Sequence, residues 1–217
     1  MLMMIPAMMM VAATVALDSA SAALASADRF KPPLNADQRQ TLFEVASKKG
    51  DEATDRLLEI VSATYNSRAE ANILANERTD EGGESVLHLA CIWGGPRKVR
   101  GLLAAGADPN ARSSKQESGL DMTPLTWCCY AGYTDEVKEF LSDPRTDVNL
   151  VVRTEAGGFM TALDIANKIA GGGHPSGETL VTLLKEHGAH TYSDLKAMSF
   201  GGEEIPGMPP ARKMKKK

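Results

Sequence analysis

Apolar residues recur along the centre of the chain at the spacing of short amphipathic helices. Two matching stripes follow glycines, with Val99, Leu102 and Leu103 after Gly94, and Val137, Phe140 and Leu141 after Gly132. Positions i, i+3 and i+4 lie on one face of a helix, so each stripe predicts a helix that buries the same side. Glycine readily adopts the left-handed conformation that ends a helix. We therefore expect another helix and a tight turn before each stripe.

A shorter motif opens each of these preceding helices. It occurs at 85–90, 123–128 and 161–166, with starts that lie 38 residues apart. Turn residues follow the helix pairs, at 106–111, 147–149 and 188–189. Self-similarity at such a period is the signature of a repeat architecture, in which each helix pair buries its apolar face against its neighbours.

The unit at 85–111 resembles an ankyrin repeat. Its opening, Ser-Val-Leu-His-Leu-Ala, is similar to the Thr-Pro-Leu-His-x-Ala of that family, and Gly-Ala-Asp-Pro-Asn near its end matches the Gly-Ala-Asp-x-Asn close. A degenerate earlier unit is expected from Thr41, with Glu44, Lys48 and Lys49 as the polar cap of a terminal repeat. The resemblance implies an all-α fold, an ankyrin-repeat solenoid of about four helix-turn-helix repeats with finger loops. The expected domain is 36–195, with units near 36–80, 82–114, 119–155 and 158–195.

The spacing of 38 residues exceeds the ankyrin period of about 33, so residues are inserted in each unit. The surplus falls at 112–118, at 153–158 and, in the last unit, between the two helices at 171–177. Insertions in repeat proteins map to loops, often on the binding face. The lengthened finger loops are thus candidates for partner contacts, with slack spacers as the alternative.

The two ends of the chain differ from its centre. Residues 1–35 form an apolar, Ala- and Ser-rich segment, and 1–17 carries no charged side chain. A signal peptide has such a stretch and a small-residue cleavage site, found here at 20–22 or 25–27, but it also begins with Lys or Arg. A targeting signal, a membrane anchor and a free tail stay open, and so does localisation: secretory or organellar with a signal, otherwise cytoplasmic. At the other end, 196–217 is expected to be a disordered basic tail.

Composition and motifs give no basis for catalysis. The chain has 43% hydrophobic and 24% charged residues and a net charge of -4, which is typical of a globular protein and unlike one that coats nucleic acid. The glycine spacing at 172–177 resembles a phosphate-binding loop, but Glu178 stands where such a loop has Lys. His88 and Cys91 have the spacing of two metal ligands, whereas zinc needs about four. We expect no catalytic residue, cofactor, metal or nucleic-acid partner.

Two further expectations concern contacts between neighbouring units. By resemblance to the family, His88 hydrogen-bonds within its turn and to the next repeat, and Thr126 and Asp164 take its place in the following units. The three cysteines are predicted to be free thiols. Cys91 and Cys129 hold equivalent positions on helices that should lie about 8–10 Å apart, whereas a disulfide needs Cα atoms within about 7 Å.

The resemblance also indicates where a partner would bind. In that family, side chains just before the first-helix glycine and just before each repeat start face the concave groove. Here they are Glu84, Ile92, Trp93, Met122, Tyr130, Ala131, Met160, Lys168 and Ile169. Aromatic residues and Met are enriched in protein interfaces. We expect a protein partner, bound without chemistry through the groove and finger loops by a chain that is monomeric alone. Two alternatives remain: the fingers cover the groove, or the chain is a membrane-associated accessory subunit of a larger assembly.

Overall fold

The computed structural model describes residues 34–63, 68–80, 83–113, 121–154, 157–199, 205 and 207–208. Within these residues the chain forms ten helices and one two-stranded antiparallel sheet. In chain order the elements are α2 (Ala36–Ala46), α3 (Asp51–Ala63), α4 (Arg68–Ala75), α5 (Val86–Trp93), α6 (Pro96–Ala104), α7 (Pro124–Tyr130), α8 (Thr134–Ser142), β1 (Val152–Arg153), β2 (Phe159–Met160), α9 (Ala162–Gly171), α10 (Gly177–Glu186) and α11 (Tyr192–Met198). The all-α fold class is confirmed.

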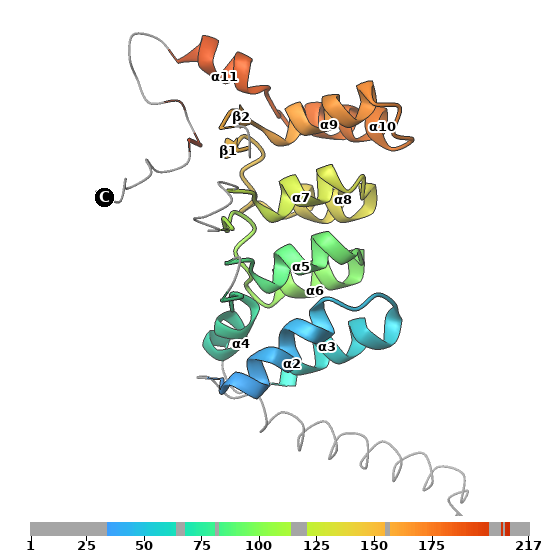
Figure 1. The fold of residues 1–217 in the computed structure, drawn as a ribbon, viewed down its shortest axis with the longest axis vertical. Helices are drawn as coiled ribbons and strands as arrows, with labels where there is room; N and C mark the ends of the chain where they lie inside the picture. Colours follow the sequence, from blue (N-terminus) through green and yellow to red (C-terminus); the bar gives the residue numbers. More distant parts are fainter. Residues whose placement is uncertain are drawn as a thin grey trace, which may run out of the picture.

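Four helix pairs lie one above the other in a single stack (Figure 1). The first helices α2, α5, α7 and α9 form one column, and the second helices α3, α6, α8 and α10 form the other. One continuous apolar core fills the stack. Its fully buried members include Leu42, Leu57, Leu102, Phe140 and Leu184, so every pair contributes to it. Each helix pair therefore buries its apolar stripe against its neighbours, as the periodicity predicts.

The same capping box starts the first helix of every unit. A side-chain oxygen at the N-cap accepts from the backbone N–H three residues later, and that later side chain accepts from the N-cap N–H. The pairs are Asn35 with Gln38, Ser85 with His88, Thr123 with Thr126, Thr161 with Asp164, and Thr191 with Asp194. The first unit thus begins at Asn35, and the predicted start at Thr41 lies inside α2. The box at Thr191 starts α11, which runs past the predicted domain end at 195.

Two glycines end first helices in the way that the sequence predicts. Gly94 follows α5 with φ 81°, and Gly132 follows α7 with φ 74°. These left-handed conformations are strained for any residue with a Cβ. They turn the chain back so that the second helix of each pair lies against the first.

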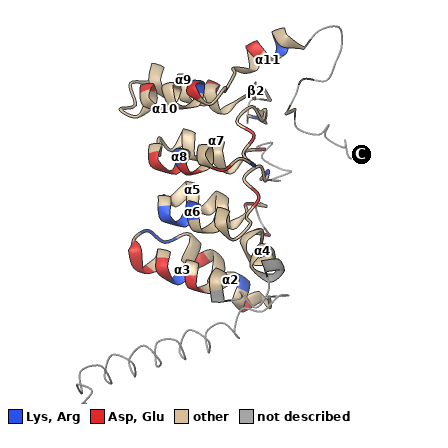
Figure 2. Cartoon of the chain, turned by 180° about the vertical axis from the view of Figure 1, so that it is seen from behind, with Lys and Arg blue, Asp and Glu red and all other residues tan. Residues whose placement is uncertain are grey.

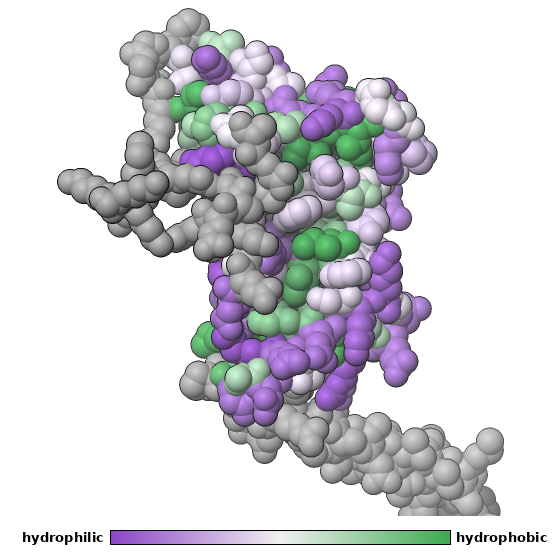
Figure 3. Space-filling model, viewed as in Figure 1, coloured by the Kyte–Doolittle hydropathy of each residue, from purple (hydrophilic) through white to green (hydrophobic). Residues whose placement is uncertain are grey.

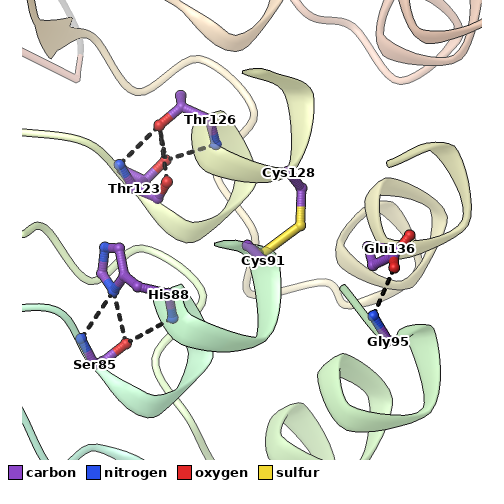
Figure 4. Close-up of a disulfide and its surroundings, with 8 residues drawn as sticks. All are labelled: Ser85, His88, Cys91, Gly95, Thr123, Thr126, Cys128 and Glu136. Carbon is purple, nitrogen blue, oxygen red and sulfur yellow. Dashed lines mark hydrogen bonds between the residues drawn. A yellow bond between two sulfur atoms is a disulfide. The ribbon is translucent and has the colours of Figure 1, made fainter. Parts of the chain in front are cut away.

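His88 ties its unit to the next one, as expected from the family resemblance. Its Nδ1 accepts from the Ser85 backbone N–H at 3.0 Å, which leaves the proton on Nε2 to be donated to the Met122 carbonyl at 3.1 Å (Figure 4 draws the Ser85 side). Complete burial lowers the pKa of the ring to about 3. Asp164 makes the equivalent link, since it accepts from the Tyr192 N–H at 2.8 Å. Thr126 bonds within its own turn.

Asparagines that follow α4, α6 and α8 make a regular second set of links between units. We call Asn76, Asn110 and Asn149 the asparagine ladder. Each accepts a backbone N–H from the next unit and donates to a carbonyl there. In chain order, the side-chain oxygens accept from the backbone N–H groups of Asp108, Asp147 and His190, at 2.8, 2.9 and 2.8 Å. In the same order, the side-chain nitrogens donate to the backbone carbonyls of Gly106, Arg145 and Gly188, at 3.1, 2.8 and 3.1 Å. The ladder holds successive turns at a fixed spacing.

The prediction of free thiols is wrong for Cys91 and Cys128, which form a disulfide between α5 and α7 (Figure 4). Their Cα atoms lie 4.7 Å apart. Helix axes about 8–10 Å apart bring facing Cα atoms to roughly 3.5–5.5 Å, because each Cα lies about 2.3 Å from its own axis. The axis separation therefore overstates the distance between facing residues. Cys129 is a free buried thiol whose pKa is raised to about 12 by desolvation.

The segments between units contain structure that the helical pattern does not predict. Helix α4 lies between the first and second helix pairs. The lengthened finger at 153–158 belongs to a hairpin in which Val152 pairs with Met160 and Arg153 with Phe159. Residues 155–156 of this finger and 114–120 of the preceding one lie outside the described residues, as do 1–33 and most of the predicted basic tail.

Candidate partner-binding groove

Two aromatic side chains are exposed at equivalent places on the first-helix column. Trp93 ends α5 with 42% of its surface exposed, and Tyr130 ends α7 with 61% exposed. The Tyr130 ring packs edge-on against Trp127, with ring centroids 6.0 Å apart. An aromatic ring held in place yet open to water is the kind of residue that anchors protein interfaces.

The two helices that carry these rings have no charged side chain. Neither α5 nor α7 contains a Lys, Arg, Asp or Glu, and Figure 2 shows the charged residues concentrated on α3, α6 and α8 instead. Figure 3 shows hydrophobic surface over the middle of the stack, around α5 and α7, with hydrophilic surface over α2 and α3 below it. The middle of the groove can therefore accept apolar side chains without burying a charge.

The other predicted groove residues differ in how accessible they are. Lys168 is exposed, whereas Ile92, Ala131 and Ile169 are half-buried, and both isoleucines pack against the core. These four residues lie on or directly after the first helices, which is where the resemblance places them.

The residues just before the repeat starts are less available than predicted. Met122 is buried at 6% exposure, because its N–H and carbonyl bond to Ser113 and draw it into the base of the finger. Met160 is half-buried in β2 and packs against the core. Glu84 is half-buried and accepts from the Thr79 hydroxyl at 2.8 Å. Met122 therefore offers a partner less surface than the family resemblance implies.

A hollow at the α2 end of the groove is not apparent from the sequence. Its volume is about 800 Å³, and it lies between α2, α5 and the finger that joins the first two units. It is lined by Ala36, Arg39, Gln40, Phe43, Glu44, Ser47, Thr79, Asp80, Glu84 and Leu89. From the sequence, Glu44 is expected to be a solvated residue of the polar cap. It lines a concave site only because the finger folds beside it.

Charge in this hollow is unevenly balanced. Arg39 pairs with Asp80 at 3.0 Å and with Glu77 at 3.1 Å, and the hydrogen bond that Arg39 donates to Asp80 is the main reason that the pKa of Arg39 is raised. Glu44 accepts from Gln40 and Glu84 accepts from Thr79, but neither carboxylate forms an ion pair with another described residue. The hollow thus presents two unneutralised acids.

Other kinds of site find little support in the described part of the chain. No three His, Cys, Asp or Glu side chains among these residues are grouped so that they could hold a metal ion. The glycine-rich segment at 171–177 joins α9 to α10 and so follows a helix, whereas a phosphate-binding loop follows a strand. None of the described helices combines the length and apolar character that crossing a membrane requires.

Comparison with known families agrees with this geometry. Residues 82–114 match the family model of the ankyrin repeat, and these residues contain α5 and α6. Searching the curated proteins gives no match. The unit at 82–114 is therefore similar to an ankyrin repeat, and equivalent helix pairs are stacked on either side of it. Ankyrin repeats generally mediate protein–protein interaction and are typically non-catalytic.

Proposed function

We propose that this protein is a non-catalytic interaction module that binds a protein partner through the concave groove, with Trp93 and Tyr130 as anchors. The observation that carries the proposal is the exposure of these two rings, 42% and 61%, on first helices without charged side chains. Interface hot spots are enriched in Trp and Tyr set in a surface that excludes water.

Rigidity of the groove supports the same conclusion. The Cys91–Cys128 disulfide joins the two helices that carry the anchors, and Trp127 holds Tyr130 from the side. Binding to a surface that is already ordered avoids part of the entropy cost of association. The two anchors therefore keep their relative position in the free protein.

The test begins by cross-linking the protein to its partner in its native source and identifying the partner by mass spectrometry. Affinity is then measured with purified proteins for the wild type and for Trp93→Ala with Tyr130→Ala. We expect the double substitution to weaken binding by at least about 2 kcal/mol, roughly 30-fold. The melting temperature should stay nearly unchanged, because 42% of Trp93 and 61% of Tyr130 are exposed and neither belongs to the apolar core.

A matched control replaces apolar residues of similar exposure outside the predicted groove. Ile73 and Met198 are 50% and 54% exposed. Ile73→Ala with Met198→Ala should leave the affinity within about threefold of wild type, since scattered surface apolar residues contribute little. Equal losses for the two double variants, or a large fall in melting temperature with binding intact, would refute the groove.

A further inference from the structure

The chain returns to the fingers after α11. The carbonyl of Gly207 accepts from the Val151 backbone N–H at 2.9 Å and from the Arg112 guanidinium at 2.8 Å. A side chain at Gly207 would meet the Asn149 carbonyl, so the approach requires glycine. This contact joins residues 95 positions apart and fixes the point from which the rest of the C-terminal segment leaves.

A row of arginines connects this point to the hollow beside α2. Arg112 carries the Gly207 contact, and its own carbonyl accepts from Arg78 at 2.6 Å. The Arg78 carbonyl in turn accepts from Arg39 at 2.6 Å, and Arg39 lines the hollow. The Gly207 contact and the hollow therefore lie along the same edge of the stack, at the bases of successive fingers.

The segment that follows the Gly207 contact is positively charged, whereas the hollow has two carboxylates without a positive partner among the described residues. Residues 209–217 carry Arg212, Lys213, Lys215, Lys216 and Lys217 and no acid. The hollow presents Glu44 and Glu84 in a lining that also includes the apolar Phe43 and Leu89. Opposite charges in a partly enclosed site attract more strongly than they do in open water.

The distance is within reach of this segment. Neighbouring units stack about 8–10 Å apart, so the two steps from the third finger to the first cover roughly 20 Å. Nine extended residues span about 30 Å. A tethered segment of this length has an effective concentration in the millimolar range at sites that it can reach, which favours even weak contacts.

We propose that the basic C-terminal segment 209–217 docks in the hollow of its own chain, with its lysines and arginine against Glu44 and Glu84. The docked segment covers the α2 end of the partner groove and leaves Trp93 and Tyr130 open. The contact is intramolecular, it weakens with ionic strength because it is ionic and lies at the surface, and it does not depend on the identity of the partner.

Zero-length cross-linking of the full chain tests this placement. A carbodiimide joins a lysine amine to a carboxylate only where the two touch, and an equal mixture of ¹⁵N-labelled and unlabelled protein separates links within a chain from links between chains. We expect amides from Lys213, Lys215, Lys216 or Lys217 to Glu44 or Glu84, with both halves of each link from the same isotopic copy. Mixed-isotope links, or no link to either acid, overturn the proposal.

The acids of the second helices are the internal control for that experiment. Glu52 and Asp135 are exposed on α3 and α8, away from the fingers. Glu44→Gln with Glu84→Gln should abolish the specific links, while Glu52→Gln with Asp135→Asn should leave them unchanged. Links that fall on Glu52 and Asp135 as often as on Glu44 and Glu84 show nonspecific attraction and overturn the proposal.

A binding measurement gives an independent readout. The probe is a fluorescent synthetic peptide with the sequence of 209–217, and the two proteins are the full chain and a chain ending at Met208. We expect the shortened chain to bind the peptide roughly tenfold or more tightly than the full chain, because the tethered segment competes in the latter. Equal binding to both chains, or none to either, overturns the inference. Neither of these outcomes bears on the proposed function, because the Trp93 and Tyr130 substitutions test it separately.

Discussion

At the scale of single residues, His88 shows how one side chain serves two units. Its ring is fully buried, and both of its nitrogens are hydrogen-bonded in the neutral form. A proton on Nδ1 would remove the acceptor that the Ser85 N–H requires. The neutral state is therefore part of the fold, and burial holds the pKa at about 3, compared with 6.5 for an unperturbed histidine.

This depressed pKa predicts acid sensitivity. Below about pH 6.5, His88 is protonated in the unfolded chain but stays neutral in the folded chain. The contribution of His88 to the free energy of unfolding is therefore complete above pH 6.5 and is lost as the pH falls toward 3. At pH 5 the loss should be about 2 kcal/mol. Urea unfolding at pH 7.5 and pH 5 measures it.

The matched variant for that measurement is His88→Gln, since Gln38 occupies the equivalent capping position in α2. Gln does not titrate, so its chain should lose about 2 kcal/mol less than wild type between the two pH values. His187→Gln, at an exposed histidine, should behave like wild type. Identical pH dependence in all three chains would contradict the role assigned to His88.

At the scale of elements, the disulfide joins two helices that the sequence pattern already pairs. Cys91 and Cys128 lie on the facing sides of α5 and α7, with a sequence separation of 37 residues. Closing a loop of this size reduces the entropy of the unfolded chain. The bond therefore strengthens the contact between the second and third units, which is also the part of the stack that carries the two anchors.

Reduction should reveal this contribution. Mass spectrometry of the oxidised protein under non-reducing conditions should show a Cys91–Cys128 peptide pair and an unpaired Cys129. Adding a reductant should lower stability by about 2–4 kcal/mol, measured as a fall in melting temperature, without change in the far-UV spectrum at low temperature. Cys91→Ala with Cys128→Ala should show no reductant effect. A Cys91–Cys129 pair would contradict the register of α7.

The helix pairs could be predicted from local signals, and the segments between them could not. The stripes after Gly94 and Gly132 and the capping residues Ser85 and Thr123 are encoded within a few positions. Helix α4 and the β1–β2 hairpin depend on packing against neighbouring units, which no local pattern specifies. Predicting the Cys91–Cys128 bond requires the distance between facing residues, which depends on the helix radius as well as on the helix spacing.

The binding groove stays a prediction, although the exposure of some of its residues could be predicted. Trp93 and Tyr130 are exposed where the family resemblance placed them, because the ends of first helices repeat from unit to unit. Met122 is buried because a long-range bond to Ser113 draws it inward. The hollow beside α2 arises from a finger and a helix more than thirty positions apart along the chain, and no local pattern in either segment specifies how the two meet.

At the scale of the whole molecule, the asparagine ladder couples each unit to the next. Each unit touches only its neighbours, so stability is approximately a sum of unit and interface contributions. Asn110 is the central rung, with bonds of 2.9 Å from the Asp147 N–H and 2.8 Å to the Arg145 carbonyl. Loss of this rung weakens the interface at the middle of the stack.

Asn110→Ala should therefore cost about 1–3 kcal/mol, because it leaves two backbone groups without partners. Asn167→Ala, at an exposed position on α9, should stay within about 0.5 kcal/mol of wild type. Hydrogen exchange in the Asn110→Ala chain should rise at Asp147 and in the turn around it. Uniform exchange with no such increase would show that the ladder does not couple the units.

The disulfide has a mechanical consequence as well. When a stack of units is pulled from its ends, the units unravel one after another and release their length as extended chain. The residues between Cys91 and Cys128 cannot contribute, because the covalent bond carries the load past them. Because the bond bypasses a sequence separation of 37, the oxidised protein should stretch about 130 Å less than the reduced one. The second helix of the second unit would thus be shielded from tension that reaches both ends of the chain.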